Sequence, residues 1–390
     1  MIDYRRAGKL PVKPHTAFRD EASALYHEHC FTRGGFDGPF SILYHRHPPQ
    51  DHGDGSPHEA LWPERREADE AAHDGLRRRH LRSQELAVGG SATTGRTPLF
   101  FNADITVGVL RPTATDEFYF ANGDGDDLFF IHEGGGELRS NFGRLRFAAG
   151  DYVCVPRSVA HRFVLDAEPQ HWLWFECRSG LRLPTQYRNP VGQLRMDAPY
   201  THRDFRGPEL ADTLDPDGPR AVISKRGDRY SRHLYRHEVL DTVGWDGTVY
   251  PFVFPIARFS AKAGQVHLPP TVHGTFATGG SLVCSFVPRM VDFGEGAIPC
   301  PYPHSNVDVD EVIFYCDGDF TSRRGVSGGS LSFHPAGVPH GPQPGAYEGS
   351  IGVKAVSELA VMLDTFEPLR VTTAGRALDT PGYDESWWSR

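Results

Sequence analysis

Two imidazoles and one carboxylate in the last quarter of the chain have the types and spacing to bind one metal ion. The stretch PYPHSNVDVDEVIFYCDGDF, residues 301–320, carries His304 and Glu311, and GSLSFHPAGVPHGP, residues 329–342, carries His340. Glu311 leads directly into Val-Ile-Phe-Tyr, a run typical of a buried strand. Two histidines and one carboxylate on one face of an ion leave the opposite positions open, as non-haem Fe(II) chemistry requires. We therefore predict a metal site at His304, Glu311 and His340.

Neighbouring polar residues leave alternatives open. Asp310 is the rival acid. Adjacent residues of a strand point to opposite faces, so only one of Asp310 and Glu311 can face the metal. The six residues between Glu311 and Gly318 match the spacing of the motif and select Glu311. Asn306 stands where a fourth ligand would be expected, which argues against a four-ligand site. We assign His334 to the pocket or to the surroundings of the ligands, with a simple packing role as the alternative.

Two facing strands of a small barrel must position these side chains. Five residues separate Gly329 from Pro335, and a Pro-x-Gly turn and two residues precede His340. This is the spacing of the second motif of the cupin superfamily, and the interval from Glu311 to Gly318 matches the end of its first motif. Glycine suits such turns because it tolerates a positive φ.

An incomplete copy of the pattern lies further upstream. GDYVCVPRSVAH repeats the second-motif spacing with Gly150, Pro156 and His161. Its partner stretch, NGDGDDLFFIHEGGG, offers aspartates but no histidine at ligand spacing. One imidazole does not hold iron, so we predict that this half is the metal-free structural partner in a bicupin.

Short strands and turns dominate the chain. From residue 98 onward, runs such as DLFFIHEG and HRFVLD alternate with Gly, Pro, Asp and Asn, and 42 glycines and 31 prolines allow only a few short helices. We predict an all-β bicupin of two jelly-roll (double-stranded β-helix) barrels. Residues 1–240 form a cupin-like, metal-free domain, and residues 241–390 form the catalytic cupin domain. The charged residues 57–86 are expected to be an insertion, either a surface helix or a partly mobile segment.

Composition excludes several classes of function. The net charge of −9 disfavours nucleic acid as a partner, and no apolar run approaches the roughly 18–20 residues of a membrane span. The N-terminus lacks the apolar core of a secretory signal. Six scattered cysteines without a CxxC pair favour reduced thiols. We therefore expect a cytoplasmic protein that acts on a small molecule.

Residues 245–345 resemble the homogentisate 1,2-dioxygenases in their compact bacterial form. The pieces that carry the resemblance are GWDGTVYPFVF, HLPPTVHGTF, SLVCSFVPR, AIPCPYPHSNVDVDEV, GDFTSR and GGSLSFHPAGVPHGPQPG. The N-terminal KPHTAFRDEASALYHEH and GGFDGPFSILYHRHPP are also similar to that family. The resemblance covers most of the chain and is interrupted by residues 57–86.

The resemblance implies an Fe(II)-dependent enzyme of aromatic catabolism, in tyrosine degradation, that opens homogentisate to maleylacetoacetate with O2. It also implies a homo-oligomer, a trimer or a hexamer. His304, Glu311 and His340 match the iron ligands, and His273 matches the histidine that does acid–base work on the ring hydroxyl. His334 matches a pocket histidine near the substrate, and His340 adjoins the substrate as well.

Two departures from the family pattern bear on the substrate. Glu311 follows the first histidine by seven residues where the better-known animal members have six, which implies a slightly longer turn. Phe320, a predicted substrate contact, stands where they carry a tyrosine whose hydroxyl contacts substrate. Tyr302 or Tyr315 could replace that donor. Two other functions remain open: a dioxygenase acting on another hydroquinone or phenolic acid, and a non-oxidative cupin, either a binding protein or an isomerase.

Overall fold

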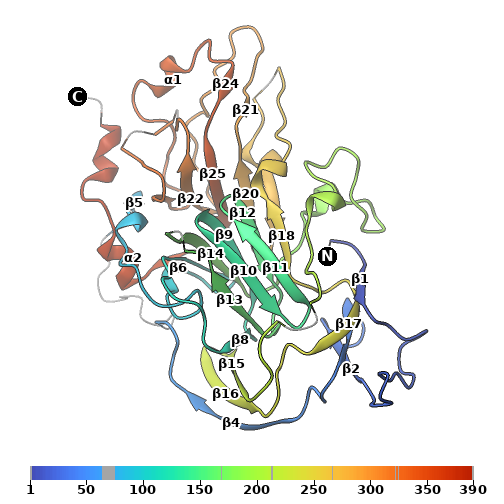
Figure 1. The fold of residues 1–390 in the computed structure, drawn as a ribbon. Helices are drawn as coiled ribbons and strands as arrows, with labels where there is room; N and C mark the ends of the chain where they lie inside the picture. Colours follow the sequence, from blue (N-terminus) through green and yellow to red (C-terminus); the bar gives the residue numbers. More distant parts are fainter. Residues whose placement is uncertain are drawn as a thin grey trace.

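The computed structural model describes residues 2–63, 75–167, 169–211, 214–265, 267–320, 322–323 and 325–388. Strands joined by loops and turns are its main regular elements (Figure 1). The two α-helices of this part are single turns, α1 (Ala346–Gly349) and α2 (Thr373–Ala377). The 3-10 turns are η2 (Ser83–Glu85), η3 (Thr185–Tyr187), η4 (His202–Asp204), η5 (Ile256–Arg258), η6 (Pro270–His273) and η7 (Tyr383–Trp387). The predicted all-β class with a few short helices is confirmed. Within the same residues, no helix is long and apolar enough to cross a membrane.

Three large sheets make up the body of the molecule. In spatial order, the outer sheet consists of β11 (Gly143–Ala148), β10 (Gly135–Ser140), β13 (His161–Leu165), β8 (Tyr119–Asn122), β15 (Arg220–Arg226), β16 (Arg229–Tyr235) and β4 (His52–His58). The middle sheet consists of β18 (Phe252–Pro255), β12 (Asp151–Val155), β9 (Asp126–Glu133), β14 (His171–Cys177), β7 (Ile105–Leu110), β6 (Thr97–Phe101) and β26 (Arg370–Val371). The C-terminal sheet consists of β19 (Gly274–Ala277), β20 (Ser281–Phe286), β25 (Leu359–Thr365), β22 (Asp310–Asp317), β23 (Leu331–His334) and β5 (Arg79–Leu81).

The middle sheet is covered on both faces, which explains its continuous apolar strands. Successive residues of β9 point to opposite sides. Phe129 packs on Phe163 of the outer sheet at a ring-centroid distance of 5.2 Å, and Phe130 packs on Phe314 of the C-terminal sheet at 6.4 Å. Full burial of such a ring stabilises the fold by about 1.5–3 kcal/mol. The alternation of side chains along β9 therefore joins the middle sheet to both of its neighbours.

Two smaller sheets lie beside these layers. One contains β1 (Arg5–Gly8), β17 (Thr242–Gly247), β3 (Phe40–His45) and β2 (His27–Thr32), and the other pairs β21 (Arg289–Met290) with β24 (Ala355–Val356). β17 lies between two N-terminal strands, and β18 extends the middle sheet beside β12. Strand pairing therefore crosses residue 240 in both directions. The division of the chain at that point, and its assignment to two jelly-roll barrels, stay predictions.

The segment predicted as an insertion contains a strand of the C-terminal sheet. β5 pairs with β23 in the register Leu81 to Leu331. Arg79 is buried because Asp379 lies 2.6 Å from its guanidinium, and His80 lies 2.9 Å from the Thr380 hydroxyl. The expectation of a surface helix is wrong for residues 57–63 and 75–86, which contain the end of β4, strand β5 and the 3-10 turn η2. The sequence suggests that the charge of Arg79 is solvated, but Asp379 of the C-terminal tail neutralises it. Residues 64–74 of this prediction lie outside the described residues.

Candidate metal centre and its pocket

The three predicted ligands meet where β22 begins. Glu311 is the second residue of that strand, and two loops bring His304 and His340 beside it. The backbones of the two histidines exchange hydrogen bonds of 2.8 and 2.9 Å. One ligand atom from each of the three side chains lies within 4.8 Å of the others. The structure thus assembles two imidazoles and one carboxylate from positions up to 36 residues apart.

In both histidines Nδ1 faces a backbone carbonyl, which leaves Nε2 available as a ligand. Nδ1 of His304 lies 3.2 Å from the carbonyl oxygen of Tyr302, and Nδ1 of His340 lies 3.0 Å from that of Val338. A carbonyl that accepts from Nδ1–H fixes the tautomer and leaves Nε2 with a free lone pair. Nε2 of His340 is buried, has no hydrogen-bond partner and lies 3.9 Å from Oε1 of Glu311. An unpartnered acceptor beside a carboxylate fits a divalent cation.

Charges at the centre also suit a metal. Burial would raise the pKa of Glu311, but the hydrogen bond from His334 and the nearby His340 and Arg323 lower it to about 2. Burial lowers the pKa of His334 to about 4 and holds that of His340 below its usual value. Near neutral pH the carboxylate of Glu311 is therefore ionised and the ring of His340 is neutral, the protonation states in which these groups bind metals.

Asp310, the alternative acid, has a structural role. Its two oxygens accept hydrogen bonds from the backbone N–H groups of Ala336 and Leu369, each at 2.7 Å. The carboxylate ties two loops to the start of β22 from the face opposite to Glu311. This arrangement agrees with the choice of Glu311 as the ligand.

His334 contacts two of the three proposed ligands, whereas His273 packs on an aromatic ring instead. His334 is fully buried, donates from Nδ1 to Glu311 and stacks on His340 with ring centroids 4.7 Å apart. His273 ends η6, and its ring packs on Phe286 at 4.7 Å, with Nδ1 buried and unpartnered. Burial and, to a lesser degree, Arg289 lower the pKa of His273 to about 3. The predicted substrate contacts of both histidines stay predictions.

A cavity of about 110 Å³ adjoins the centre and is lined by His304, Glu311, Phe286 and Phe320 among others. Phe320 is thus part of the wall, where its ring packs on Tyr315 at 4.8 Å. The hydroxyl of Tyr315 lies 2.8 Å from that of Ser332, and Tyr302 is half exposed outside the wall. Neither tyrosine therefore presents a free hydroxyl next to Phe320.

Two arginines in the cavity wall were missed from the sequence. Arg289 forms an ion pair of 2.7 Å with Glu358, which neutralises it. Arg323 donates to the carbonyl oxygens of Ser322 and Gly341, and its Nε is buried without a partner. Among the described residues, no carboxylate forms an ion pair with Arg323. The sequence offered one indication of this role for Arg323, its position three residues after Phe320. The surrounding residues otherwise indicate a charged turn.

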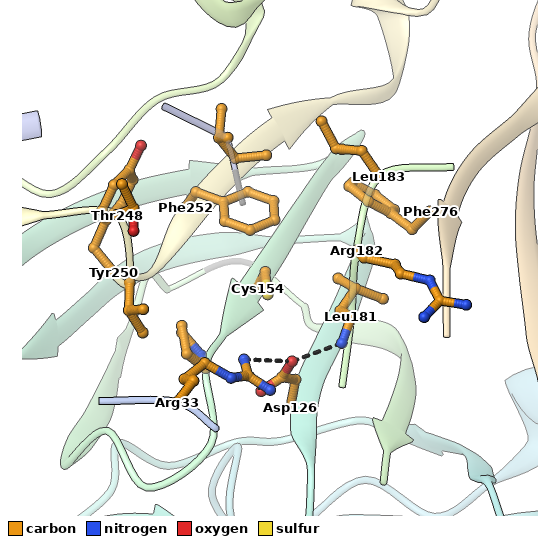
Figure 2. Close-up of a pocket in the computed structure, with 13 residues that line it drawn as sticks. Arg33, Asp126, Cys154, Leu181, Arg182, Leu183, Thr248, Tyr250, Phe252 and Phe276 are labelled. Atoms are coloured by element: carbon orange, nitrogen blue, oxygen red, sulfur yellow. Dashed lines mark hydrogen bonds and ion pairs between the residues drawn. The ribbon is translucent and has the colours of Figure 1, made fainter. Parts of the chain in front are cut away.

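A smaller cavity, of about 50 Å³, has different chemistry. Figure 2 shows mostly apolar side chains around Cys154, with Arg33 and Asp126 paired at 2.8 Å along one side. Asp126 also accepts from the backbone N–H of Leu181 at 2.6 Å. Arg33 and Asp126 neutralise each other, and Asp126 is the only carboxylate in this lining, so the chemistry does not favour a metal there.

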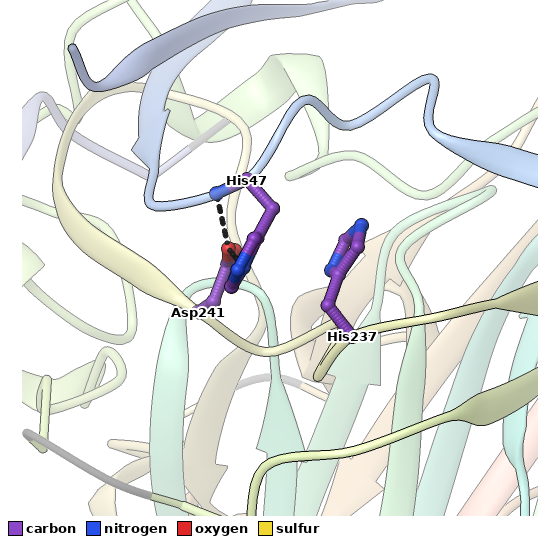
Figure 3. Close-up of side chains that lie close together, drawn as sticks. All are labelled: His47, His237 and Asp241. Atoms are coloured by element: carbon purple, nitrogen blue, oxygen red, sulfur yellow. Dashed lines mark hydrogen bonds and ion pairs between the residues drawn. The ribbon is translucent and has the colours of Figure 1, made fainter. Parts of the chain in front are cut away.

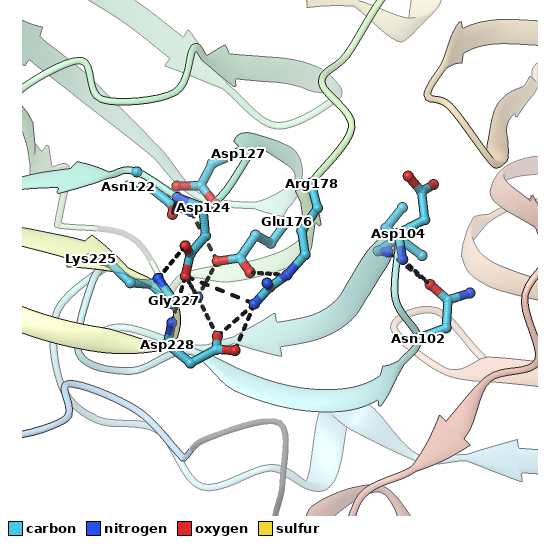
Figure 4. Close-up of polar contacts among 12 residues, drawn as sticks. Asn102, Asp104, Asn122, Asp124, Asp127, Glu176, Arg178, Lys225, Gly227 and Asp228 are labelled. Carbon is cyan, nitrogen blue, oxygen red and sulfur yellow. Dashed lines mark hydrogen bonds and ion pairs between the residues drawn. The ribbon is translucent and has the colours of Figure 1, made fainter.

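Protein cations neutralise the acids of the N-terminal half. Figure 4 shows Lys225 and Arg178 among the carboxylates of Asp124, Glu176 and Asp228. Arg96 is likewise buried against Asp127, at 3.1 Å. His161 lies between Phe120 and Phe163 with its Nε2 unpartnered, and none of the metal-type clusters in the described part of the chain includes it. The metal-free character of this barrel interior stays a prediction.

Comparisons with known proteins identify the family of the chain. The model of the homogentisate 1,2-dioxygenase N-terminal family matches residues 101–256. A Saccharolobus solfataricus protein named "Putative dioxygenase SSO1533" is 32% identical over 393 residues, which span 100% of both chains. The homogentisate 1,2-dioxygenase of Bradyrhizobium diazoefficiens is 27% identical over 286 residues, 69% of this chain and 62% of that enzyme. The matched part is thus less than two thirds of that longer enzyme.

Solved structures give weaker matches. A cupin 2 conserved barrel domain protein from Leptotrichia buccalis aligns with a TM-score of 0.34 and 9% identity, over 74% of this chain and 96% of that one. Protein Ylba from E. coli gives the same two values over 78% and 97%. The stronger ground is the full-length match at 32% identity together with the family model. On that ground, the chain belongs to the homogentisate 1,2-dioxygenase family.

Proposed function

We propose that this dioxygenase-family protein is an Fe(II)-dependent ring-cleaving enzyme that opens homogentisate to maleylacetoacetate with O2. The observation that carries the proposal is the meeting of His304, Glu311 and His340 at the wall of a cavity. Two imidazoles and one carboxylate on one face are the donor set of non-haem Fe(II) oxygenases. Family membership supports the same chemistry.

The ligand set fits iron in number, donor type and charge. His304 and His340 would bind through Nε2, and Glu311 through its carboxylate. When bound there, iron would supply the Lewis acidity and redox chemistry that couple O2 to an electron-rich ring. His334 holds the carboxylate of Glu311 in place by its Nδ1–H, 2.5 Å away. The chain itself therefore sets the orientation of the acid before any metal arrives.

Arg323 favours an anionic substrate. Its guanidinium donates to two backbone carbonyls and forms no ion pair with a carboxylate of the described residues, and the nearby Glu311 compensates its charge only through space. A substrate carboxylate would form a charge-assisted hydrogen bond with it. The acetate group of homogentisate meets this requirement, as do the carboxylates of other phenolic acids.

His273 is the proposed partner of the ring hydroxyl. A pKa of about 3 makes it a neutral imidazole, which accepts a hydrogen bond but stores a proton poorly near neutral pH. We therefore assign it the role of orienting the hydroxyl and easing removal of its proton. Its unpartnered Nδ1 is the available acceptor.

Phe320 supports one alternative, a dioxygenase of the same family that acts on a different phenolic acid. Phe320 itself has no hydroxyl to offer a substrate. The hydroxyl of the adjacent Tyr315 is already hydrogen-bonded to Ser332, so it does not replace the missing group. A substrate with an apolar edge at this place would fit better than one with a polar group there. We further propose that the protein works as a homo-oligomer in the cytoplasm.

An oxygen-electrode assay tests the proposal. The chain would be purified anaerobically, loaded with Fe(II) and mixed with homogentisate, gentisate or unsubstituted hydroquinone. We expect one O2 consumed per homogentisate, and none with the Glu311→Ala variant. Uptake with gentisate alone would establish the alternative substrate. No uptake with any phenol by iron-loaded protein would leave a non-oxidative cupin.

A further inference from the structure

A second group of two imidazoles and one carboxylate lies apart from the proposed dioxygenase site and shares no residue with it (Figure 3). Its members are His47, His237 and Asp241, and one ligand atom from each lies within 4.8 Å of the others. His47 follows strand β3. His237 and Asp241 lie on the segment between β16 and β17. None of these residues takes part in the proposed dioxygenase site.

The distances within this group already suit one ion. Nδ1 of His47 lies 3.0 Å from Oδ2 of Asp241, and the backbone N–H of His47 donates to the same oxygen at 2.7 Å. Two ligand atoms on one metal, with bonds of about 2.0–2.1 Å, lie roughly 3 Å apart. The rings of His47 and His237 stack with centroids 4.3 Å apart and an angle of 18° between them. Figure 3 shows the two rings side by side, with the carboxylate next to His47.

His237 provides an independent sign of a missing partner. The residue is only 8% exposed, and its Nδ1 lies 2.9 Å from the carbonyl oxygen of Glu238. That contact leaves Nε2 as an acceptor, and Nε2 is buried with no hydrogen-bond partner. Buried polar atoms are rarely left unpaired, because the loss of water costs about 1–3 kcal/mol. A bound cation would satisfy this nitrogen.

Two further histidines, His45 and His29, form a chain of contacts that begins at the other oxygen of the Asp241 carboxylate. Nδ1 of His45 lies 2.7 Å from Oδ1 of Asp241, and Nε2 of His45 lies 3.3 Å from Nδ1 of His29. Burial would raise the pKa of Asp241, but the hydrogen bonds from His45 and His47 hold it below the ordinary value. An ionised carboxylate oriented by a neighbouring imidazole is a common setting for a metal ligand.

The group opens into a cavity of about 410 Å³ on the outer sheet. Ala121 and Val222 line this cavity, whereas their neighbours Phe120 and Ile223 point into the core on the other side of the sheet. The cavity is therefore outside the barrel interior that contains His161. Three protein ligands would leave coordination positions that face this space.

We propose that His47, His237 and Asp241 form a second binding site, for a divalent transition-metal ion such as Zn²⁺. Imidazole and carboxylate donors suit ions of this class. The proposed site would bind a metal with two residues of the segment 1–240, which the sequence predicts to be metal-free. It lies outside the predicted barrel interior that contains His161.

Metal counting tests this proposal separately from the dioxygenase chemistry. Metal-stripped protein would be loaded with Zn²⁺ alone, desalted and analysed by mass spectrometry, with Co²⁺ absorption as a second probe. We expect two ions per chain in the wild type, one in Glu311→Ala, and none in Glu311→Ala combined with His47→Gln. His47 suits this test because its side chain is 42% exposed, so its replacement leaves the core intact.

His52→Gln in the Glu311→Ala background is the matched control. This exposed histidine packs on Tyr235, which also touches the ring of His237, yet it lies outside the proposed ligand set. The control should retain one ion, and Zn²⁺ should raise its melting temperature by a few degrees. Asp241→Asn should lose both effects. The proposal is overturned if Glu311→Ala binds no ion, or if it binds one that the His47 and Asp241 changes do not remove. Absent O2 uptake would leave this result untouched.

Discussion

Nδ1 of His334 lies 2.5 Å from Oε1 of Glu311, and the two residues are direct partners across strands β23 and β22. The hydrogen bond is therefore fixed by strand register. A slip of one residue would turn Glu311 to the opposite face of the sheet. The orientation of the proposed acidic ligand is a property of sheet pairing, so His334 is best understood as a positioning residue.

Replacement of His334 tests that role. His334→Ala should weaken Fe(II) binding by about 10- to 100-fold, the usual effect of removing a group that orients a ligand. Equilibrium dialysis against Fe(II) would measure the change. His334→Gln, which retains an N–H donor, should recover part of the affinity. Unchanged iron affinity with a raised KM would instead show that His334 contacts substrate.

Substitutions of Asp310 and Glu311 should affect different properties, stability for Asp310 and activity for Glu311. Glu311→Ala, like His304→Ala or His340→Ala, should abolish O2 uptake while the fold is retained. Asp310→Ala should keep iron-dependent activity but lower the free energy of unfolding by about 2–5 kcal/mol, because two backbone N–H groups lose their acceptor. Urea unfolding and O2 uptake separate the two effects. His161→Ala is the control and should keep full activity. Activity lost only in Asp310→Ala would identify Asp310 as the ligand.

The pH profile tests His273. Its pKa of about 3 lies below the ordinary 6.5, so the ring is neutral over the range where the protein would be assayed and protonates only as the pH approaches 3. No ionisation of His273 should appear in kcat between about pH 5 and 9. His273→Ala should keep iron and lose about 10²- to 10⁴-fold in kcat, as for other acid–base groups. Near-normal turnover would reduce His273 to a packing residue.

Arg323 should decide between charged and uncharged phenols. Arg323→Gln should lower kcat/KM for homogentisate by about 10- to 100-fold, in line with the loss of a hydrogen bond to a charged group. The rate with unsubstituted hydroquinone should change little. Arg289→Gln is the matched control, because Glu358 already neutralises that charge. An equal loss for both substrates would argue against a carboxylate contact.

Phe320→Tyr tests the alternative substrate. If the aromatic wall marks an altered specificity, the wild type should prefer an analogue, and the variant should shift kcat/KM toward homogentisate. A panel of phenolic acids with and without the acetate group would show the shift. If the wild type already turns over homogentisate better than every analogue, Phe320 only fills the wall.

The sequence predicted what depends on local spacing. The intervals around Glu311 and His340 indicate a strand, a turn and a return strand, so the sequence alone selected three side chains that the structure brings together. Their role as ligands stays a prediction. Arg79 and His80 were misjudged because Asp379, which neutralises Arg79, and Thr380, which hydrogen-bonds to His80, each lie 300 residues away. His47 and Asp241, 194 residues apart, are likewise joined only by tertiary structure. Local patterns carry no information about such pairs.

Strand β5 has a consequence for synthesis of the protein. It covers the edge of the C-terminal sheet next to β23, and the Ser83 hydroxyl beyond it donates to the carbonyl of Gly329, 246 residues later. At about 5–20 residues per second, the ribosome needs roughly 12–50 s to make the partner of this strand. During that time β5 has no sheet to join, and the later β23 emerges with an open edge that other chains can pair with. Deletion of residues 79–81 should therefore first cause newly made chains to aggregate.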